Sequence, residues 1–222
     1  MKRRSFLQLA FTALSLPILG SEAVASARAF HMVGTSTRRY IATKQRVANR
    51  GVPPDDFLDQ LIAWGRTAPE ELFAANAHKD VYANVIQVLG PWKGIEQRRA
   101  ALLEVMRVLA GFESSWNWDA GRDVTNPNSV TPDTIEAGAW QVSADSMHFG
   151  QDLRTLVLQK VGTVDGNDFQ RVTKKNHTFA MEYVARLLRI TVNHNGPVKR
   201  HEIDAWLRRD SVSEFMQFLT ES

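Results

Sequence analysis

Two glutamates, Glu113 and Glu136, are the residues of this chain whose type and spacing best suit them to chemistry. They lie 23 positions apart, since 136 − 113 = 23. Glu113 ends a long apolar run, and Glu136 begins the segment Glu-Ala-Gly-Ala-Trp-Gln at 136–141. Cleaving a glycosidic bond requires a carboxylic acid that stays protonated in a dry environment, usually with a second group across a groove. Glycosidic-bond cleavage is therefore the first hypothesis.

The expected position of Glu113 on a helix predicts a raised pKa. Met106, Leu109 and Glu113 are three and four residues apart, which places them on one side of a helix. The carboxylate would continue an apolar stripe and stand near the negative end of the helix dipole, and both effects favour its protonated form. The alternative is that Glu113 turns to solvent or pairs with an arginine such as Arg107 or Arg122.

The elements that must hold these glutamates are mainly helices. A helix is expected to start at Pro53-Pro54-Asp55, where proline and acidic residues precede apolar residues at helical spacing. The longest helix is expected from Ile95 to about Phe112. Its apolar residues cover most of the circumference, and only Glu104 and Arg107 interrupt the inner half, so it should be central and buried.

The rest of the chain predicts shorter helices and one long loop. Residues 119–143 are rich in Gly, Asn, Pro, Ser and Thr, which indicates a loop with a small β-hairpin. The fold class expected is thus α+β, predominantly helical. Further helical segments are expected after Pro69, at 144–161, at 177–192, and in shorter pieces after Lys199 and Ser213.

Composition limits the possible chemistries. The 222 residues are enough for one substantial core, and 44% hydrophobic with 23% charged residues is typical of a folded soluble protein. The chain has no cysteine, which excludes disulfides, thiolate nucleophiles and cysteine-based metal sites. No Gly-rich phosphate loop, Gly-x-Ser-x-Gly elbow or His-Glu-x-x-His pair is present, so we expect no cofactor and no metal.

Residues 1–27 have the pattern of an export signal. Basic residues at 2–4 precede an apolar stretch at 9–19 and a small-residue run at 23–27. The paired arginines resemble a twin-arginine signal, and an ordinary secretory signal is the alternative. Both predict a periplasmic or secreted protein. The apolar stretch is too short for a stable membrane span.

The basic residues are unevenly distributed. Residues 28–54 contain six basic and no acidic side chains, whereas residues 55–222, the expected catalytic domain, contain 18 Lys plus Arg against 23 Asp plus Glu. Few large apolar residues in 28–54 predict a flexible arm, which either serves as a solvated linker or binds an anionic wall polymer or lipid headgroups. The basic residues lack interleaved aromatic residues, so we expect no nucleic-acid partner.

Three short motifs resemble one enzyme family. The segment 111–116, Gly-Phe-Glu-Ser-Ser-Trp, is similar to the catalytic Glu-Ser motif of soluble lytic transglycosylases and goose-type lysozymes. The segment 138–143, Gly-Ala-Trp-Gln-Val-Ser, resembles their Gly-x-x-Gln motif, and 193–196, Asn-His-Asn-Gly, resembles a degenerate Tyr-Asn-x-Gly motif. The resemblance covers roughly residues 90–196 and implies a lysozyme-like fold with a small β-hairpin beside an active-site groove.

The resemblance implies a role for each matching residue. Glu113 corresponds to the general acid that protonates the leaving glycosidic oxygen. Ser114 corresponds to the serine that holds the N-acetyl group or orients the glutamate, and Gln141 to the glutamine that lines the sugar groove. Trp116 and Trp140, within the two motifs, are candidate substrate-binding residues, as dry walls or sugar-stacking faces.

The third motif departs from the family pattern. Asn193, His194 and Asn195 are the candidate substrate-binding residues there, and either His194-Asn195 or 192–193 aligns with Tyr-Asn. The tyrosine is missing in both alignments. His194 either replaces its hydroxyl as a hydrogen-bond donor or caps a helix end.

Whether Glu136 is a catalytic base decides between two reactions. An inverting hydrolase needs a base about 6.5–9.5 Å from the acid, whereas a lytic transglycosylase needs one carboxyl because the sugar's own groups complete an anhydro ring. Glu136 is the candidate base or else a residue that fixes the loop, and Asp119, Asp123 and Asp133 are the fallback bases.

The function expected is therefore an exported enzyme that cleaves β-1,4 bonds of peptidoglycan, as a lytic transglycosylase or muramidase. A hydrolase of the chitinase or chitosanase kind that uses both glutamates is one alternative. A non-catalytic wall-binding protein that keeps the groove is the other.

Overall fold

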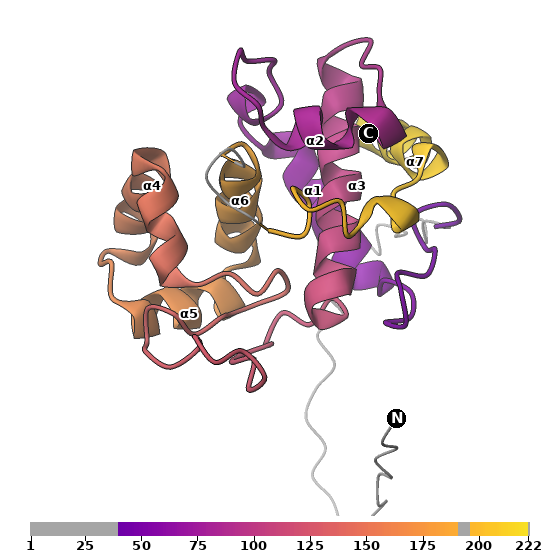
Figure 1. The fold of residues 1–222 in the computed structure, drawn as a ribbon. Coiled ribbons are helices and arrows are strands. Elements are labelled where there is room, and N and C mark those ends of the chain that lie inside the picture. Colours follow the sequence, from indigo (N-terminus) through magenta and orange to yellow (C-terminus); the bar gives the residue numbers. More distant parts are fainter. Residues whose placement is uncertain (1–39, 191–195, 222) are drawn as a thin grey trace, which may run out of the picture. The chain divides into compact units, whose positions relative to one another are not determined.

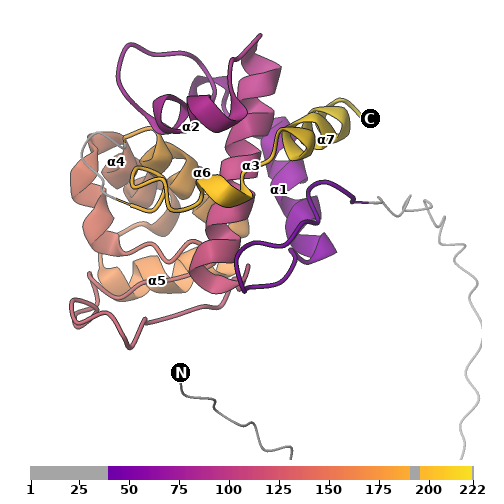
Figure 2. The same ribbon diagram turned by 45° about the vertical axis from the view of Figure 1, so that its right-hand side comes forward.

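Helix α3 (Ile95–Ser114) runs through the middle of the folded part of the protein, and the other helices pack around it (Figures 1 and 2). The structure is a computed structural model that describes residues 40–190 and 196–221. Helices α1, α2, α6 and α7 contact α3, and α4 and α5 contact α6. The other helices are α1 (Asp55–Thr67), α2 (Val81–Leu89), α4 (Gln151–Val161), α5 (Gly166–Lys175), α6 (His177–Leu188) and α7 (Arg209–Thr220), with short 3₁₀ helices η1 (Glu70–Leu72), η2 (Ala144–Phe149) and η3 (Asp204–Trp206).

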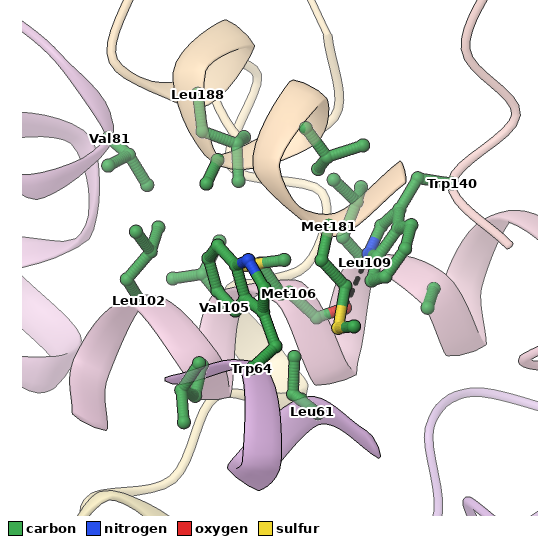
Figure 3. Packing of buried hydrophobic residues seen from close by; sticks show 14 of the residues in the cluster. Leu61, Trp64, Val81, Leu102, Val105, Met106, Leu109, Trp140, Met181 and Leu188 are labelled. Atoms are coloured by element: carbon green, nitrogen blue, oxygen red, sulfur yellow. Dashed lines mark hydrogen bonds between the residues drawn. The ribbon is translucent and has the colours of Figure 1, made fainter. Parts of the chain in front are cut away.

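The core forms on both sides of α3. Leu102, Val105 and Met106 are fully buried, since they face α1 and α6 rather than solvent. Figure 3 shows Leu61 of α1 and Met181 of α6 converging on this part of α3. Complete burial of an aliphatic side chain stabilises the fold by ~1.5–3 kcal/mol, so α3 holds the layers together.

The predicted central helix is confirmed, and it reaches slightly further than expected. It begins at Ile95, as the pattern predicts, and includes Glu113 in its last turn before Ser115 ends it in a left-handed conformation (φ 59°). Helix α1 also begins at Asp55, as predicted. The pattern at 144–161 gives two helices, because the chain is extended at Gly150 between η2 and α4.

Two helices were not predicted from the sequence, although both carry a recognisable start. Asp80 caps α2 by accepting hydrogen bonds from the backbone N–H groups of Tyr82 and Ala83. Asp165 caps α5 in the same way through Asn167 and Asp168. An aspartate before a short apolar-periodic segment is the signal that could have found them.

The expected β-hairpin is wrong in the part of the chain that the structure describes. Residues 119–143 form turns, and their one piece of β-structure is an isolated antiparallel bridge between Ala137 and Val142. The two backbones exchange N–H···O bonds of 2.9 and 3.2 Å there. A tight turn at Gly138 closes the loop at once, which leaves no length for paired strands.

Residues 40–54, hereafter the N-terminal strap, are packed on the helices, so the prediction of a flexible arm as far as Pro54 is wrong for this segment. Thr43 and Val47 are fully buried. The carboxylate of Glu214 in α7 accepts hydrogen bonds from the backbone N–H groups of Ile41, Ala42 and Thr43 at 2.7–3.2 Å. The scarcity of large apolar residues fails as a guide here because hydrogen bonds from backbone groups also hold the segment in place.

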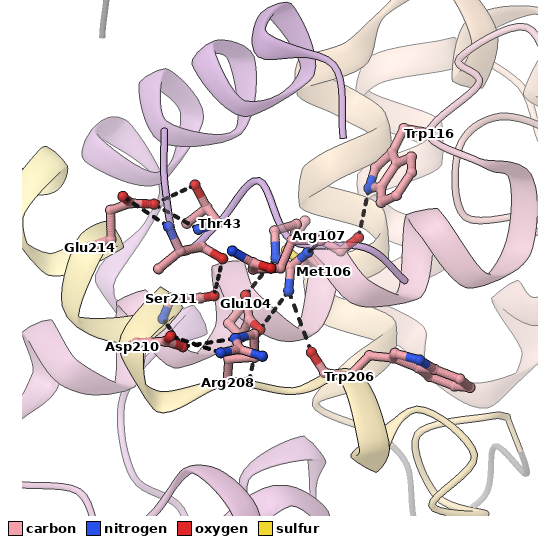
Figure 4. Close-up of polar contacts among 12 residues, drawn as sticks. Thr43, Glu104, Met106, Arg107, Trp116, Trp206, Arg208, Asp210, Ser211 and Glu214 are labelled. Carbon is pink, nitrogen blue, oxygen red and sulfur yellow. Dashed lines mark hydrogen bonds and ion pairs between the residues drawn. The ribbon is translucent and has the colours of Figure 1, made fainter. Parts of the chain in front are cut away.

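A buried ion pair within α3 fixes two neighbouring segments. Arg107 donates two hydrogen bonds to Glu104 at 2.7 and 2.8 Å, and both side chains are fully buried (Figure 4). Arg107 also donates to the carbonyl of Gln45 in the strap, and Glu104 accepts from the backbone N–H of Arg208 before α7. The two charged interruptions of the α3 pattern are therefore an internal pair with its remaining hydrogen bonds satisfied.

The predicted export signal (1–27) and residues 28–39 lie outside the described residues. Within 40–190 and 196–221, no helix has the length and apolar character required to cross a membrane.

Candidate active site

Glu113 lies where an apolar pocket meets a polar cleft. The apolar pocket has a volume of about 120 Å³ and the polar cleft about 450 Å³, and Glu113 and Gln141 line both. The walls of the pocket include Leu109, Trp140, Val184, Leu187 and Leu188. The cleft is lined in addition by Arg50, Asp123, Thr125, Asn126 and Glu136. The two glutamates singled out in the sequence therefore line one cleft.

Burial raises the pKa of Glu113 to about 7. Loss of water around the carboxylate is the main cause, because the side chain is partly enclosed at the mouth of the apolar pocket. Arg200 and Arg50 oppose the rise, and Glu202 and Asp123 add to it. The predicted direction of the shift is confirmed. Of the two arginines considered as partners, Arg107 is paired with Glu104 inside the core.

A tight turn at 137–142 places Gln141 beside Glu113. The Ala137–Val142 bridge closes the turn, and the N–H of Gly138 donates to the carbonyl of Ala120 at 2.8 Å. Gly138 and Gln141 both have positive φ values, 73° and 48°. The Gln141 side chain donates from Nε2 to the carbonyl of Gly138 at 3.0 Å, so its amide is oriented before any ligand binds.

Ser114 ties the end of α3 to this turn. Its hydroxyl donates to the carbonyl of Ala139 at 2.7 Å and accepts from the N–H of Asn117 at 3.1 Å. The hydroxyl proton is thus committed to the protein backbone. Of the two roles that the resemblance implies for Ser114, orienting the glutamate fits these contacts better than holding an N-acetyl group.

Glu136 anchors the loop whose residues Asp123, Thr125 and Asn126 line the cleft. Its carboxylate accepts hydrogen bonds from the N–H of Asp123 at 3.3 Å, from Nδ2 of Asn126 at 2.5 Å and from Oγ of the buried Ser129 at 2.6 Å. These three donors come from successive turns of the loop. The alternative reading of Glu136, as a residue that fixes the loop, agrees with this network.

Trp116 has a packing position rather than the sugar-stacking position that was predicted. Its side chain is 3% exposed and lines neither cavity. The indole N–H donates to the carbonyl of Arg107 at 2.8 Å (Figure 4). The ring lies against Gly111. The chain reaches this position because Ser115 and Trp116 both adopt left-handed backbone conformations.

Trp140 is a wall of the apolar pocket and at the same time part of the core. It is 3% exposed, and its indole N–H donates to the carbonyl of Met106 at 2.8 Å (Figure 3). Trp118, the other tryptophan of this region, packs on Trp140 and stacks on His177 with ring centroids 3.9 Å apart. Trp140 can therefore give the pocket its apolar surface but presents little of its face.

The remaining sequence candidates are dispersed. Asn193, His194 and Asn195 lie outside the described residues, and Pro197, just after them, lines the apolar pocket. Of the fallback bases, Asp123 lines the polar cleft, and Asp119 pairs with Lys175 at 3.0 Å.

Asp133 lines a separate cavity near η2. No group of three or more His, Asp or Glu side chains suited to a metal occurs among the residues described.

Arg50 is the cleft residue that sequence reasoning missed. It comes from the strap, about 60 positions before Glu113. In the sequence it is one of six basic residues in 28–54, and the charge pattern gives no reason to single it out. No local signal in the sequence links it to either glutamate.

Comparison with family models, with curated proteins and with solved structures gave no match to this chain.

Proposed function

We propose that this protein is an exported enzyme that cleaves β-1,4 bonds of peptidoglycan, with Glu113 as the general acid. The observation that carries the proposal is a carboxyl of pKa about 7 placed between an apolar pocket and a polar cleft. The motif resemblance around Glu113 and Gln141 supports the substrate class. The signal-like residues 1–27 support a periplasmic or secreted location.

The proposed chemistry begins with proton transfer. At neutral pH about half of the Glu113 side chains hold a proton that can pass to the leaving glycosidic oxygen as the bond to the anomeric carbon breaks. Efficient general acids have a pKa near the working pH, and an ordinary glutamic acid would be almost fully ionised there. Gln141, fixed by its own turn, would contact a sugar in either cavity.

The contacts of Glu136 favour lytic transglycosylation over inverting hydrolysis. A base for water must have a free lone pair directed at the substrate, whereas three of the about four lone-pair sites of the Glu136 carboxylate accept hydrogen bonds from its own loop. In transglycosylation a hydroxyl of the sugar attacks the anomeric carbon. Its proton returns to Glu113, so that no second carboxyl is required.

The substitution Glu113→Gln tests the assignment. We expect it to lower the rate of wall clearing, measured as loss of turbidity of purified peptidoglycan, by about 10²–10⁴-fold. Circular dichroism and a denaturation curve would show that the variant is folded. Unchanged clearing by a folded Glu113→Gln protein would refute the role, and binding without clearing by the wild type would favour a non-catalytic wall-binding protein.

Product analysis distinguishes the two reactions. Mass spectrometry of wild-type digests should show anhydro ends, and Glu136→Gln, which keeps one carbonyl acceptor for the loop, should retain them with less than about a tenfold loss of rate. Reducing ends, together with a loss in Glu136→Gln as large as that in Glu113→Gln, would instead identify a hydrolase that uses both glutamates.

A further inference from the structure

Arg50 places a positive charge at the polar cleft. Its side chain is exposed and lines the cleft together with Glu113, Glu136 and Gln141. Among the cleft-lining residues in the described ranges it is the one basic side chain. Its guanidinium forms no ion pair or side-chain hydrogen bond within 40–190 and 196–221, so its five donors are available to a ligand.

The backbone that carries Arg50 is held in place. The N–H of Arg50 donates to the carbonyl of Val47 at 2.9 Å, and the N–H of Val47 donates to the carbonyl of Gly51 at 3.0 Å. Val47 is fully buried, and Gly51 has a φ of 95°, which glycine adopts without strain. The buried Arg107 donates to the carbonyl of Gln45 in the same segment. Arg50 thus projects from a closed and anchored turn.

Two other residues of the cleft repel negative charge. Asp123 and Glu136 both line it, and Glu136 is fixed by its loop. A glycan that bears carboxylates would be repelled by these two side chains and attracted to Arg50, where a planar guanidinium can form two parallel hydrogen bonds to one carboxylate. A neutral glycan gains nothing from this charge.

We propose that Arg50 binds a carboxylate of the glycan and so selects anionic amino-sugar chains over neutral or cationic ones. The inference rests on the proposed function and specifies its substrate: the carboxylate is one carried by the sugar chain itself or by a peptide attached to it. Arg50 acts as a specificity-determining residue that transfers no proton, and its charge also lowers the pKa of Glu113.

Binding to the inactive Glu113→Gln protein tests the proposal without cleavage of the probes. The probes are a tetrasaccharide of alternating N-acetylglucosamine and N-acetylmuramic acid, the same tetrasaccharide with its peptides, and the neutral tetramer of N-acetylglucosamine. Arg50→Gln is compared with Arg46→Gln, a control that removes an exposed charge from the same strap but not from the cleft. Calorimetry at low ionic strength gives each Kd.

We expect Arg50→Gln to weaken binding of the carboxylate-bearing probes about tenfold and to leave the neutral tetramer and the Arg46→Gln control unchanged. The loss should shrink as salt is added. If Arg50→Gln weakens binding of the peptide-bearing probe alone, the carboxylate that Arg50 binds belongs to the peptide.

If Arg50→Gln weakens binding of all probes equally, or weakens binding of none of them, the role of Arg50 is overturned while the proposed function stays intact. A protein that binds the neutral tetramer but neither anionic probe would also overturn it. If the Glu113→Gln protein binds no probe and the wild type clears no wall, the proposed function fails together with the inference.

Discussion

At the scale of single residues, the environment of Glu113 separates it from the other carboxylates of the cleft. Glu113 lies against apolar side chains, and its burial raises its pKa to about 7. The Glu136 carboxylate, by contrast, accepts hydrogen bonds from three donors. Desolvation favours the neutral form of the Glu113 carboxyl, whereas the Glu136 carboxylate is occupied by contacts that hold its loop. Two glutamates that line the same cleft are therefore suited to different tasks.

The pH dependence of activity follows from the raised pKa. A general acid works in its protonated form, so the rate of wall clearing should fall as pH rises through about 7. An ordinary glutamic acid, with a pKa of 4.5, would give a decline near pH 4.5 instead. Initial rates between pH 4 and 9 locate the midpoint, and a midpoint near 4.5 would contradict the assigned environment.

The same carboxyl should make stability depend on pH. Because its pKa is higher in the folded chain than in the unfolded one, the protonated side chain favours folding, and this contribution is complete below about pH 4.5 and lost as pH rises through 7. The shift corresponds to ~3 kcal/mol. Urea denaturation should show the free energy of unfolding of wild type falling relative to Glu113→Gln between pH 4 and pH 8.

At the scale of elements, the end of α3 determines where Glu113 points. Ser115 and Trp116 turn back in left-handed conformations, and the Trp116 ring then covers Gly111 on the preceding turn of the helix. Ser114 binds the neighbouring turn through the carbonyl of Ala139. The Glu-Ser-Ser-Trp sequence thus forms the end of a helix, and its side chains fix the direction in which the chain leaves that helix.

Gly111→Ala tests this arrangement. A Cβ atom at Gly111 would lie 2.4 Å from Cζ2 and 2.8 Å from Cε2 of the Trp116 ring, so the indole must move. We expect a loss of ~1–3 kcal/mol in the free energy of unfolding, together with reduced wall clearing because Glu113 shifts with the helix end. Gly94→Ala is the control, since the nearest atom there is the end of the flexible Glu96 side chain at 3.3 Å. Equal stability of the two variants would show that Trp116 packs elsewhere.

At the scale of the whole molecule, α7 holds the strap against the helices that carry the cleft. The Glu214 carboxylate receives four hydrogen bonds from Ile41, Ala42 and Thr43, and Ser211 donates to the carbonyl of Ala42 at 2.8 Å (Figure 4). The last helix therefore positions the segment from which Arg50 reaches the cleft.

Glu214→Ala should loosen the strap at a distance from the cleft. Leaving the N–H groups of Ile41, Ala42 and Thr43 without their acceptor costs ~1–3 kcal/mol of stability, because Thr43 is buried. Hydrogen exchange should increase in residues 40–51 while α4 and α5 stay protected. Glu221→Ala, in the exposed residue after α7, serves as the control. Unchanged exchange in the strap would show that Val47 and Arg107 suffice to hold it.

The sequence by itself determined the central helix, its first residue and the position of Glu113 on its apolar side. Those features depend on contacts within a few turns of one helix, which periodicity records directly. It also indicated Gln141 as a neighbour of Glu113, through the motif resemblance.

Tertiary structure alone decided the positions and contacts of Trp116, Glu136 and Arg50. Trp116 is buried by a reversal of the chain, Glu136 is held by donors from a loop without periodicity, and Arg50 is brought to the cleft by a helix more than 150 residues further along. These contacts depend on hydrogen bonds between groups that are distant in sequence. No spacing within the chain encodes which groups form those hydrogen bonds.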